Sequence, residues 1–287
     1  MPPRSRTLGA LLDEMAAARP RAEAVVFRGE RLTYAVLKAR ADELARALLA
    51  VGVSKGDRVA VLLPNRAEWL VAAFAASKVG AITVGVSTFS TPREIAWILD
   101  HCRPAVLVTI EAFRGRSYLT PLYELCPELA RSAPGALRSD RFPELRAVVC
   151  VDPGRHDGVY WLGDLTGRAA DVGESALAAA QAAVAPTDLC YILYTSGSTA
   201  TPKGVSLAHY GVIENGFNIG ERQHLTEADR LWMAVPLFWS FCSANALPAI
   251  MTHGGSIVLQ ESFEPGEALA LLDGERCSVY YGMANMA

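Results

Sequence analysis

Apolar residues in the first part of the chain follow a helical period and then a strand pattern. From Thr33 they recur at steps of three and four over residues 37–51, between a threonine suited to cap a helix and Gly52 suited to end it. A short apolar run at 59–63 follows, bounded by a proline and an asparagine. These features predict a helix and then a strand that is buried on both faces.

The same alternation continues toward residue 152. Apolar runs of strand length alternate with longer helical patterns, which predicts helices at 67–79 and 92–101 and strands at 81–86, 105–110 and 145–152. Short apolar strands alternating with helices of about ten residues or more are typical of parallel βαβ units. The expected fold class is therefore α/β, with sheets flanked by helices.

Weaker patterns suggest how the chain divides. The pattern fades over 113–143, residues 154–173 are interpreted as a surface loop, and the Ala-rich stretch 174–185 fits either a helix or a linker. We therefore expect a first α/β subdomain at 1–173, a connection at 174–186 and a second α/β subdomain at 187–287. The second begins with a strand at 188–195, a glycine- and hydroxyl-rich loop, and a helix from about His209.

Composition narrows the possible partners. The 287 residues carry a net charge of −3, with 51% hydrophobic and 20% charged residues, as in ordinary folded proteins. Lys and Arg are scattered, so we expect no nucleic-acid or anionic-membrane surface, and a small-molecule partner is favoured. The longest apolar stretch, 69–89, is interrupted by Lys78 and Gly80, which argues against a transmembrane segment.

The amino terminus and the cysteines bear on location. Asp13 and Glu14 interrupt the opening segment where a signal peptide needs an apolar core. The six cysteines stand singly, without a CxxC pair or a nearby histidine, which indicates reduced thiols and not a zinc site. We expect a cytoplasmic protein.

Candidate chemistry is concentrated in YTSGSTATPKGVSLAH, residues 194–209, between a predicted strand and a predicted helix. Hydroxyl donors, glycines that let backbone amides approach an anion, and one lysine together suit a triphosphate; they are Thr195, Ser196, Gly197, Ser198, Thr199, Lys203 and Gly204. A P-loop requires GxxxxGK[ST], whereas Lys203 here lies between Pro202 and a glycine, so this is not a P-loop.

This segment resembles the signature YTSGTTGxPKGV of the adenylate-forming superfamily of acyl- and aryl-CoA synthetases, luciferases and peptide-synthetase adenylation domains. The chain departs from it at Ser198, where threonine is usual, and at Ala200, where glycine is usual. If position 200 requires a positive φ, the alanine strains the loop and weakens nucleotide binding. The alternative is a polar turn without a ligand.

The resemblance extends over essentially the whole chain. The segments 32–65 and 95–109 look like the family's opening helices and strands, and 253–287 looks like its later glycine turn, strand, helix and strand. The segment 234–247 is similar to the family's PLFH segment, which implies an acyl pocket lined by Phe238, Trp239 and Phe241. Trp239 stands where histidine is usual, which implies a narrower pocket or one that closes differently. The alternative is that these rings are core residues.

The resemblance implies that a carboxylate attacks the α-phosphorus of ATP to give acyl-AMP and pyrophosphate, and that coenzyme A then displaces AMP. It further implies Lys203 and Thr199 as catalytic residues, with Thr199 near Mg²⁺, and the motif residues as phosphate contacts. His209 is interpreted as a capping or packing residue and not as a base. The pocket aromatics favour an apolar or aromatic acid.

Other active-site parts of the family are expected beyond Ala287, so the chain is expected to be an inactive fragment of such an enzyme. Two alternatives stay open. The chain is a module that binds nucleotide or acyl group without turnover, or it belongs to an adenylation domain that loads a carrier protein.

Overall fold

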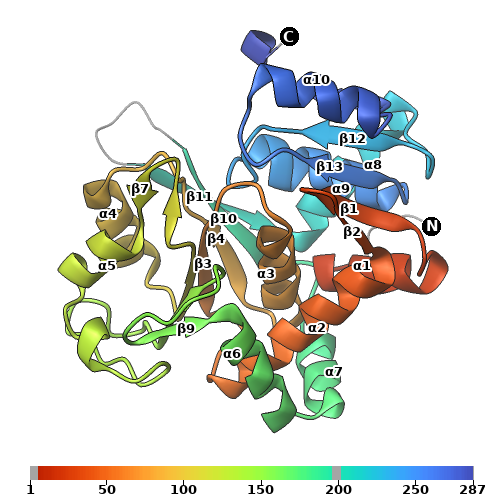
Figure 1. Ribbon diagram of the computed structural model, residues 1–287. Helices are drawn as coiled ribbons and strands as arrows, with labels where there is room; N and C mark the ends of the chain where they lie inside the picture. The colour runs from red at the N-terminus through yellow and green to blue at the C-terminus, as the bar shows by residue number, and fades with distance from the viewer. Residues whose placement is uncertain (1–5, 196–201, 287) are drawn as a thin grey trace.

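The computed structural model describes residues 6–195 and 202–286, which build two β-sheets with helices packed around them (Figure 1). In this part of the chain the larger sheet has seven strands, in the order β11 (Lys203–Ala208), β10 (Leu189–Thr195), β4 (Ile82–Gly85), β3 (Arg58–Leu62), β5 (Val106–Thr109), β8 (Ala147–Cys150) and β9 (Val159–Trp161). Only the β10–β11 pair in this sheet is antiparallel. The α/β class predicted from the alternating pattern is confirmed.

A second sheet of five strands stands beside the first within the described residues. Its order is β14 (Val279–Tyr281), β12 (Arg230–Met233), β13 (Ser256–Leu259), β1 (Glu23–Phe27) and β2 (Glu30–Thr33). Strands β1, β12, β13 and β14 run parallel, and β2 returns antiparallel along β1. A small hairpin, β6 (Ala112–Phe113) with β7 (Arg116–Ser117), lies apart from both sheets.

The helices connect and cover these strands. They are α1 (Leu8–Ala18), α2 (Tyr34–Ala50), α3 (Ala67–Lys78), α4 (Pro92–Cys102), α5 (Leu119–Leu125), α6 (Leu162–Gly167), α7 (Glu174–Ala182), α8 (His209–Gln223), α9 (Leu247–Thr252) and α10 (Pro265–Gly274). None of the helices in the described ranges is both long and apolar enough to cross a bilayer.

Several predicted elements are confirmed close to their expected limits. Thr33 caps α2, since its side chain accepts a hydrogen bond from the backbone N–H of Val36, and Gly52 after the helix has a positive φ of 81°. The strands and helices expected between residues 59 and 110 correspond to β3, α3, β4, α4 and β5. The Ala-rich stretch is the helix α7, which buries Leu177.

Other parts differ from the sequence-based expectation. The stretch 154–173, expected to be a surface loop, contains β9, α6 and a short 3₁₀ segment, and 113–143 contains α5. The stretch before His209 contains an additional strand, β11, where the pattern suggested only a loop. Periodicity needs several apolar positions in a row of turns or alternations. Elements this short have too few of them, and β11 is in addition exposed at most of its residues.

Neither sheet coincides with the expected subdomains 1–173 and 187–287. Strands β10 and β11 complete the sheet that begins with β3, and β1 pairs with β13, more than two hundred residues away in sequence. Each sheet therefore takes strands from both sides of residues 174–186. Local patterns predict strands, but strand partners are chosen by packing between distant segments, which explains the difference.

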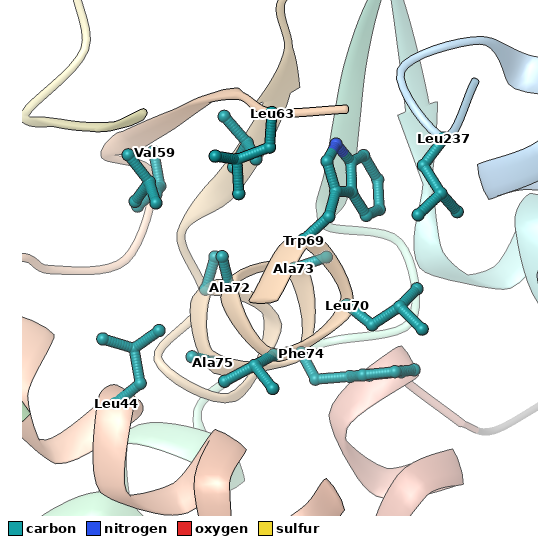
Figure 2. Packing of buried hydrophobic residues seen from close by; sticks show 14 of the residues in the cluster. Leu44, Val59, Leu63, Trp69, Leu70, Ala72, Ala73, Phe74, Ala75 and Leu237 are labelled. Atoms are coloured by element: carbon teal, nitrogen blue, oxygen red, sulfur yellow. The ribbon is translucent and has the colours of Figure 1, made fainter. Parts of the chain in front are cut away.

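The helix α3 forms the centre of the core. All its residues except Glu68 are buried, so it has no polar face apart from its first turn. Figure 2 shows Trp69 and Ala73 on one side of the helix and Leu70 and Phe74 on others, and Leu237 belongs to the same core cluster. Buried surface on every side is why α3 is Ala-rich, since small side chains let neighbouring elements approach closely.

Lys78, which interrupts the longest apolar stretch, is buried at the end of α3, with only 1% of its side chain exposed. Its ammonium pairs with Asp13 of α1 and lies 2.8 Å from the carboxylate of Asp42 on α2. A buried ammonium requires such partners, because transfer of an unpaired charge out of water is strongly unfavourable. The ion pairs join three helices at one point.

Candidate functional site

A cavity of about 580 Å³ lies where β4 and β10 end. Residues of β4, α4, β10, β11 and the segment 238–240 line it. In α/β sheets, ligands bind outside the carboxyl ends of parallel strands, where the connections diverge and leave backbone groups accessible. Its position and size make this cavity the candidate site.

The strands that flank the motif loop, β10 and β11, both contribute to the lining of this cavity. Thr195, the last residue of β10, is directly paired with Lys203, the first residue of β11. Thr195 and Pro202 line the cavity, and the side chain of Lys203 is exposed at the same end of the hairpin. The hairpin therefore holds both ends of the loop at the cavity rim. Four predicted phosphate contacts, Ser196, Gly197, Ser198 and Thr199, lie outside the described residues, as does Ala200.

Gly204, whose role as an anion contact stays a prediction, lies within the β10–β11 hairpin. It pairs with Tyr194 within the hairpin, and a Cβ there would come 3.1 Å from Cγ2 of Ile192. Its φ is not positive. Among the described residues it does not line the cavity but a smaller hollow near His101. A larger side chain at this position would crowd the side chain of Ile192.

Aromatic side chains form one wall of the cavity. The rings of Phe238 and Trp239 are 5.7 Å apart, and Phe89 lies 5.7 Å from the first and 6.0 Å from the second. Phe238 is buried, whereas Phe89 and Trp239 are 58% and 38% exposed and face the open side. We call Phe89, Phe238 and Trp239 the aromatic wall. Three mutually packed rings provide a rigid apolar surface.

Phe241, predicted as a pocket residue with the other two aromatics, is directed elsewhere. Its ring packs against Tyr281 of β14 at 4.9 Å, and it is absent from the described cavity lining. It belongs to a π-helical turn, Phe241–Ala246, that follows the aromatic wall. A contiguous aromatic run therefore does not guarantee a common face.

The backbone behind the aromatic wall packs closely on β4. A Cβ at Gly85 would lie 3.1 Å from the carbonyl oxygen of Phe238 and 3.0 Å from Cδ2 of Leu193. Glycine at this position therefore allows the wall to contact the sheet directly. Sequence reasoning missed both Phe89 and Gly85. The sequence could have indicated them only by their position, because Gly85 lies at the end of a predicted parallel strand and Phe89 lies just after it.

Polar groups in the cavity come mainly from the start of α4 and the loop before it. Ser87, Ser90 and Glu94 are part of the lining. The carboxylate of Glu94 accepts hydrogen bonds from the N–H and hydroxyl of Thr91, while the Thr91 hydroxyl accepts from the N–H of Glu94, which together form a capping box. Glu94 therefore fixes the first turn of the helix that carries Ile98 into the cavity wall.

Tyr194 is held from the other side of the hairpin. Its hydroxyl lies 2.7 Å from Nδ1 of His101, and Trp97 stacks on His101 with ring centroids 4.8 Å apart. Burial raises the pKa of Tyr194, so its hydroxyl stays protonated over the neutral range. These contacts fix the strand residue that immediately precedes Thr195.

His209 lies away from the cavity lining in the described structure, as expected for a packing residue. It is fully buried at the start of α8, and its Nδ1 accepts a hydrogen bond from the backbone N–H of Leu8 at 3.2 Å. Burial lowers its pKa to about 4, an effect only partly opposed by Asp188. The interpretation of His209 as a packing residue is confirmed.

Potential metal ligands were also compared across the described residues. No group of three or more His, Cys, Asp or Glu side chains in ranges 6–195 and 202–286 could hold a metal ion. Thr199, the predicted Mg²⁺ contact, lies outside those ranges. All six cysteines are free, and five of them are buried. Burial raises the pKa of Cys102 to about 12, so this thiol is not a poised nucleophile.

Comparison with known proteins gives this geometry a context. A family model described as AMP-binding enzyme matches residues 12–287. YngI, a proposed acyl-CoA synthetase of Bacillus subtilis (strain 168), is 34% identical over 282 residues, and the match covers 98% of this chain and 51% of YngI. The mitochondrial medium-chain acyl-CoA ligase ACSF2 of Bos taurus is 31% identical over 290 residues, covering 98% of this chain and 47% of the relative.

Solved structures show the same fold. The anthranilate CoA ligase AuaEII in complex with anthranoyl-AMP superposes with a TM-score of 0.80 at 24% identity, covering 97% of this chain and 50% of AuaEII. At this identity the superposition speaks for the fold alone. The chain spans about half the length of each of these three proteins.

Proposed function

The chain belongs to the AMP-binding enzyme family, and from this premise we propose that it supplies the ATP- and acid-binding part of an acid–thiol ligase. In the proposed reaction a carboxylate oxygen attacks the α-phosphorus of ATP, the bond to pyrophosphate breaks, and an acyl-AMP forms. The thiol of coenzyme A then attacks the acyl carbon and AMP leaves. The relatives that the chain resembles are named as acyl-CoA synthetases and ligases.

One observation carries this proposal: the two strands that flank the motif loop and the aromatic wall border the same cavity. Thr195 and Pro202 line the cavity, Lys203 is the strand partner of Thr195, and Phe238 and Trp239 form an apolar surface within the same cavity. Polar phosphates and an apolar acyl group need such adjacent but different surroundings if the carboxylate is to approach the α-phosphorus in line. The proposed contacts at Ser196, Gly197, Ser198 and Thr199 complete the phosphate side.

The chain's own residues fit the charge that the reaction develops. The Lys203 ammonium and the Thr195 hydroxyl offer donors at the two ends of the loop, where they would stabilise the phosphate oxygens as pyrophosphate leaves. Mg²⁺, when bound with ATP, would neutralise part of the triphosphate charge, with Thr199 as its proposed contact. No protein nucleophile is required.

The three rings of the aromatic wall support an apolar or aromatic acid as substrate. Phe89 and Trp239 leave ring faces open to the cavity, and Val205 of β11 adds an exposed aliphatic surface. A cavity of about 580 Å³ lies in the range of drug-sized ligand pockets, which are mostly apolar with a few polar groups. A cytoplasmic location is part of the same proposal and is supported by the free cysteines.

Calorimetric titration with Mg-ATP tests the phosphate side. Lys203→Ala and Gly197→Val should weaken binding about tenfold or more, because each removes a donor or blocks close backbone approach. Lys55→Ala is the matched control: it removes the same charge from an exposed lysine that pairs with Asp188, and its affinity should equal that of the unchanged chain.

Equal weakening by Lys55→Ala would show that only net charge matters and would contradict a specific loop site. Carboxylate-dependent ATP–pyrophosphate exchange then tests the chemistry. Thioester formation with coenzyme A would support the ligase, whereas thioester only on a carrier protein would indicate an adenylation domain. Nucleotide binding without either reaction would leave a binding module.

A further inference from the structure

Asn65 connects the two sheets beneath the aromatic wall. It lies shortly after β3, only 1% exposed. Its side-chain Nδ2 donates to the carbonyl oxygens of Val235 at 3.0 Å and Gln260 at 3.1 Å, and its Oδ1 accepts from the N–H of Leu237 at 2.8 Å. Three backbone groups on two other segments are thus satisfied by one amide.

This pattern of contacts requires an amide at position 65. Two carbonyl oxygens need two donors, and one N–H needs an acceptor, which is the set that an asparagine side chain offers. Aspartate would keep only the acceptor, and alanine would remove all three of these hydrogen bonds from a buried site. Because all three partners are backbone groups, Asn65 fixes the position of the backbone at Val235, Leu237 and Gln260, whatever side chains those residues carry.

The segment that Asn65 holds leads directly into the aromatic wall. Val235 and Leu237 follow β12 and precede Phe238 and Trp239. A second donor acts on the same carbonyl, since the buried Sγ of Cys242 lies 3.1 Å from the oxygen of Val235. This contact closes the segment 235–242, which contains Phe238 and Trp239, into a loop.

Two further contacts make the wall sensitive to this anchor. Leu237 is fully buried in the same core cluster as Trp69 of α3 (Figure 2), and the carbonyl oxygen of Phe238 would lie 3.1 Å from a Cβ at Gly85 of β4. A shift of the Val235–Leu237 backbone would thus be transmitted to Phe238 and Trp239 and not absorbed by loose packing. The rim formed by Thr195 and Lys203 belongs to a different pair of strands.

We propose that Asn65 is a positioning residue for the acid side of the site: it sets the aromatic wall, and through it the affinity for the carboxylic acid, without acting on the nucleotide side. This inference rests on the proposed function for its kinetic part. Its structural part, that Asn65 determines the position of Trp239, stands independently of the reaction.

The kinetic test compares acid and ATP dependence in ATP–pyrophosphate exchange, with benzoate and octanoate as acid probes. Asn65→Ala should raise the KM for the acid about tenfold or more, because small displacements of a binding surface cost that much, while the KM for ATP stays within about twofold. Equal rises in both KM values, or neither, would overturn the proposal.

Tyr34→Phe is the matched control. The Tyr34 hydroxyl is buried and donates to the carbonyl oxygen of Gly255 at 2.6 Å, just before the opposite end of β13. The variant loses a buried side-chain-to-backbone hydrogen bond of the same kind, so it measures the effect of lost stability alone. Both KM values should remain unchanged in Tyr34→Phe. A rise in its acid KM like that of Asn65→Ala would assign the effect to stability.

The structural test uses the chain labelled with 5-fluorotryptophan and ¹⁹F NMR, with the Trp239 resonance assigned from Trp239→Phe. Asn65→Ala should shift or broaden the Trp239 resonance and leave that of Trp161, on β9, in place. An unchanged Trp239 resonance would overturn the proposal. If the unaltered protein shows no exchange but Trp239 moves in the variant, the proposed reaction fails and the positioning role stands.

A milder variant covers the case in which Asn65→Ala does not fold. Cys242→Ala removes the second donor to Val235 and should move the Trp239 resonance in the same direction by a smaller amount. Cys242→Ser keeps a donor and should resemble the unchanged chain. An unmoved Trp239 resonance in Cys242→Ala, together with an unfolded Asn65→Ala, would make Asn65 a stability residue only.

Discussion

At the scale of single residues, buried polar side chains connect segments that are distant in sequence. Lys78 joins three helices, Asn65 joins two sheets, and His209 joins α8 to α1. Each of these three side chains is buried, so removal of its partner leaves a costly unsatisfied group. The apolar pattern of the sequence marks Lys78 only as an interruption and does not indicate the partners of any of the three.

His209 should make stability depend on pH. Its pKa is about 4 in the folded chain and 6.5 in an ordinary environment, so between these values the unfolded chain binds a proton that the folded chain does not. Its contribution is therefore complete above pH 6.5 and is lost as the pH falls toward 4. Between pH 7.5 and pH 5 the loss should be roughly 1–2 kcal/mol.

Urea unfolding of the unchanged chain and of His209→Asn at several pH values checks this. Asparagine keeps an acceptor for the N–H of Leu8 but does not titrate in this range. The difference in unfolding free energy between the two proteins should shift in favour of the variant as the pH falls. A difference that is constant from pH 7.5 to 5 would contradict a neutral, buried His209.

At the scale of elements, the start and the end of the helix α4 are both marked by local sequence signals. Thr91 and Glu94 form a capping box, Pro92 occupies the first turn, and the helix ends at Arg103 in a left-handed conformation. The same helix carries Glu94 and Ile98 to the cavity. Its start therefore affects both stability and the shape of the site.

Thr91→Ala should lower the free energy of unfolding by about 1 kcal/mol, because an N–H in the first turn loses its side-chain acceptor. Thr91→Ser, which keeps the hydroxyl, should stay within about 0.5 kcal/mol of the unchanged chain. Thermal or urea unfolding of the three proteins gives the comparison. Similar losses in both variants would mean that the threonine methyl group, and not the cap, is what stabilises the helix.

The sequence was a good guide to these elements where signals were local. The N-cap Thr33, the positive φ of Gly52 and the run of elements from β3 to β5 follow from spacing and residue type alone. It was a poor guide to β9, α6 and β11, because three to six residues are too few to show a period. It also grouped Phe241 with Phe238 and Trp239, whereas the Phe241 ring packs against Tyr281.

At the scale of the whole molecule, the two sheets are interleaved along the chain. The seven-stranded sheet needs β10 and β11, and the five-stranded sheet needs β1 and β2, from opposite sides of residues 174–186. A cut in that connection would leave β1 without its parallel neighbour β13 and β4 without β10. Much apolar surface would then be exposed on both pieces.

We therefore expect residues 1–173 alone to show no cooperative unfolding transition, and the two pieces 1–173 and 174–287 to regain one when refolded together. Circular dichroism during urea titration distinguishes the states, with the uncut chain as the control. A cooperative transition of the isolated 1–173 piece near the midpoint of the uncut chain would instead support two independent subdomains.

The sequence by itself determined the α/β class, the order of most helices and strands, and the family to which the chain belongs, because these depend on local period, capping residues and a contiguous motif. Only the tertiary structure decided which strands share a sheet, that Phe89 joins Phe238 and Trp239, and that Asn65 anchors the wall behind them. Those features depend on contacts between segments that are in part more than two hundred residues apart in sequence, and such contacts form only when the whole core packs.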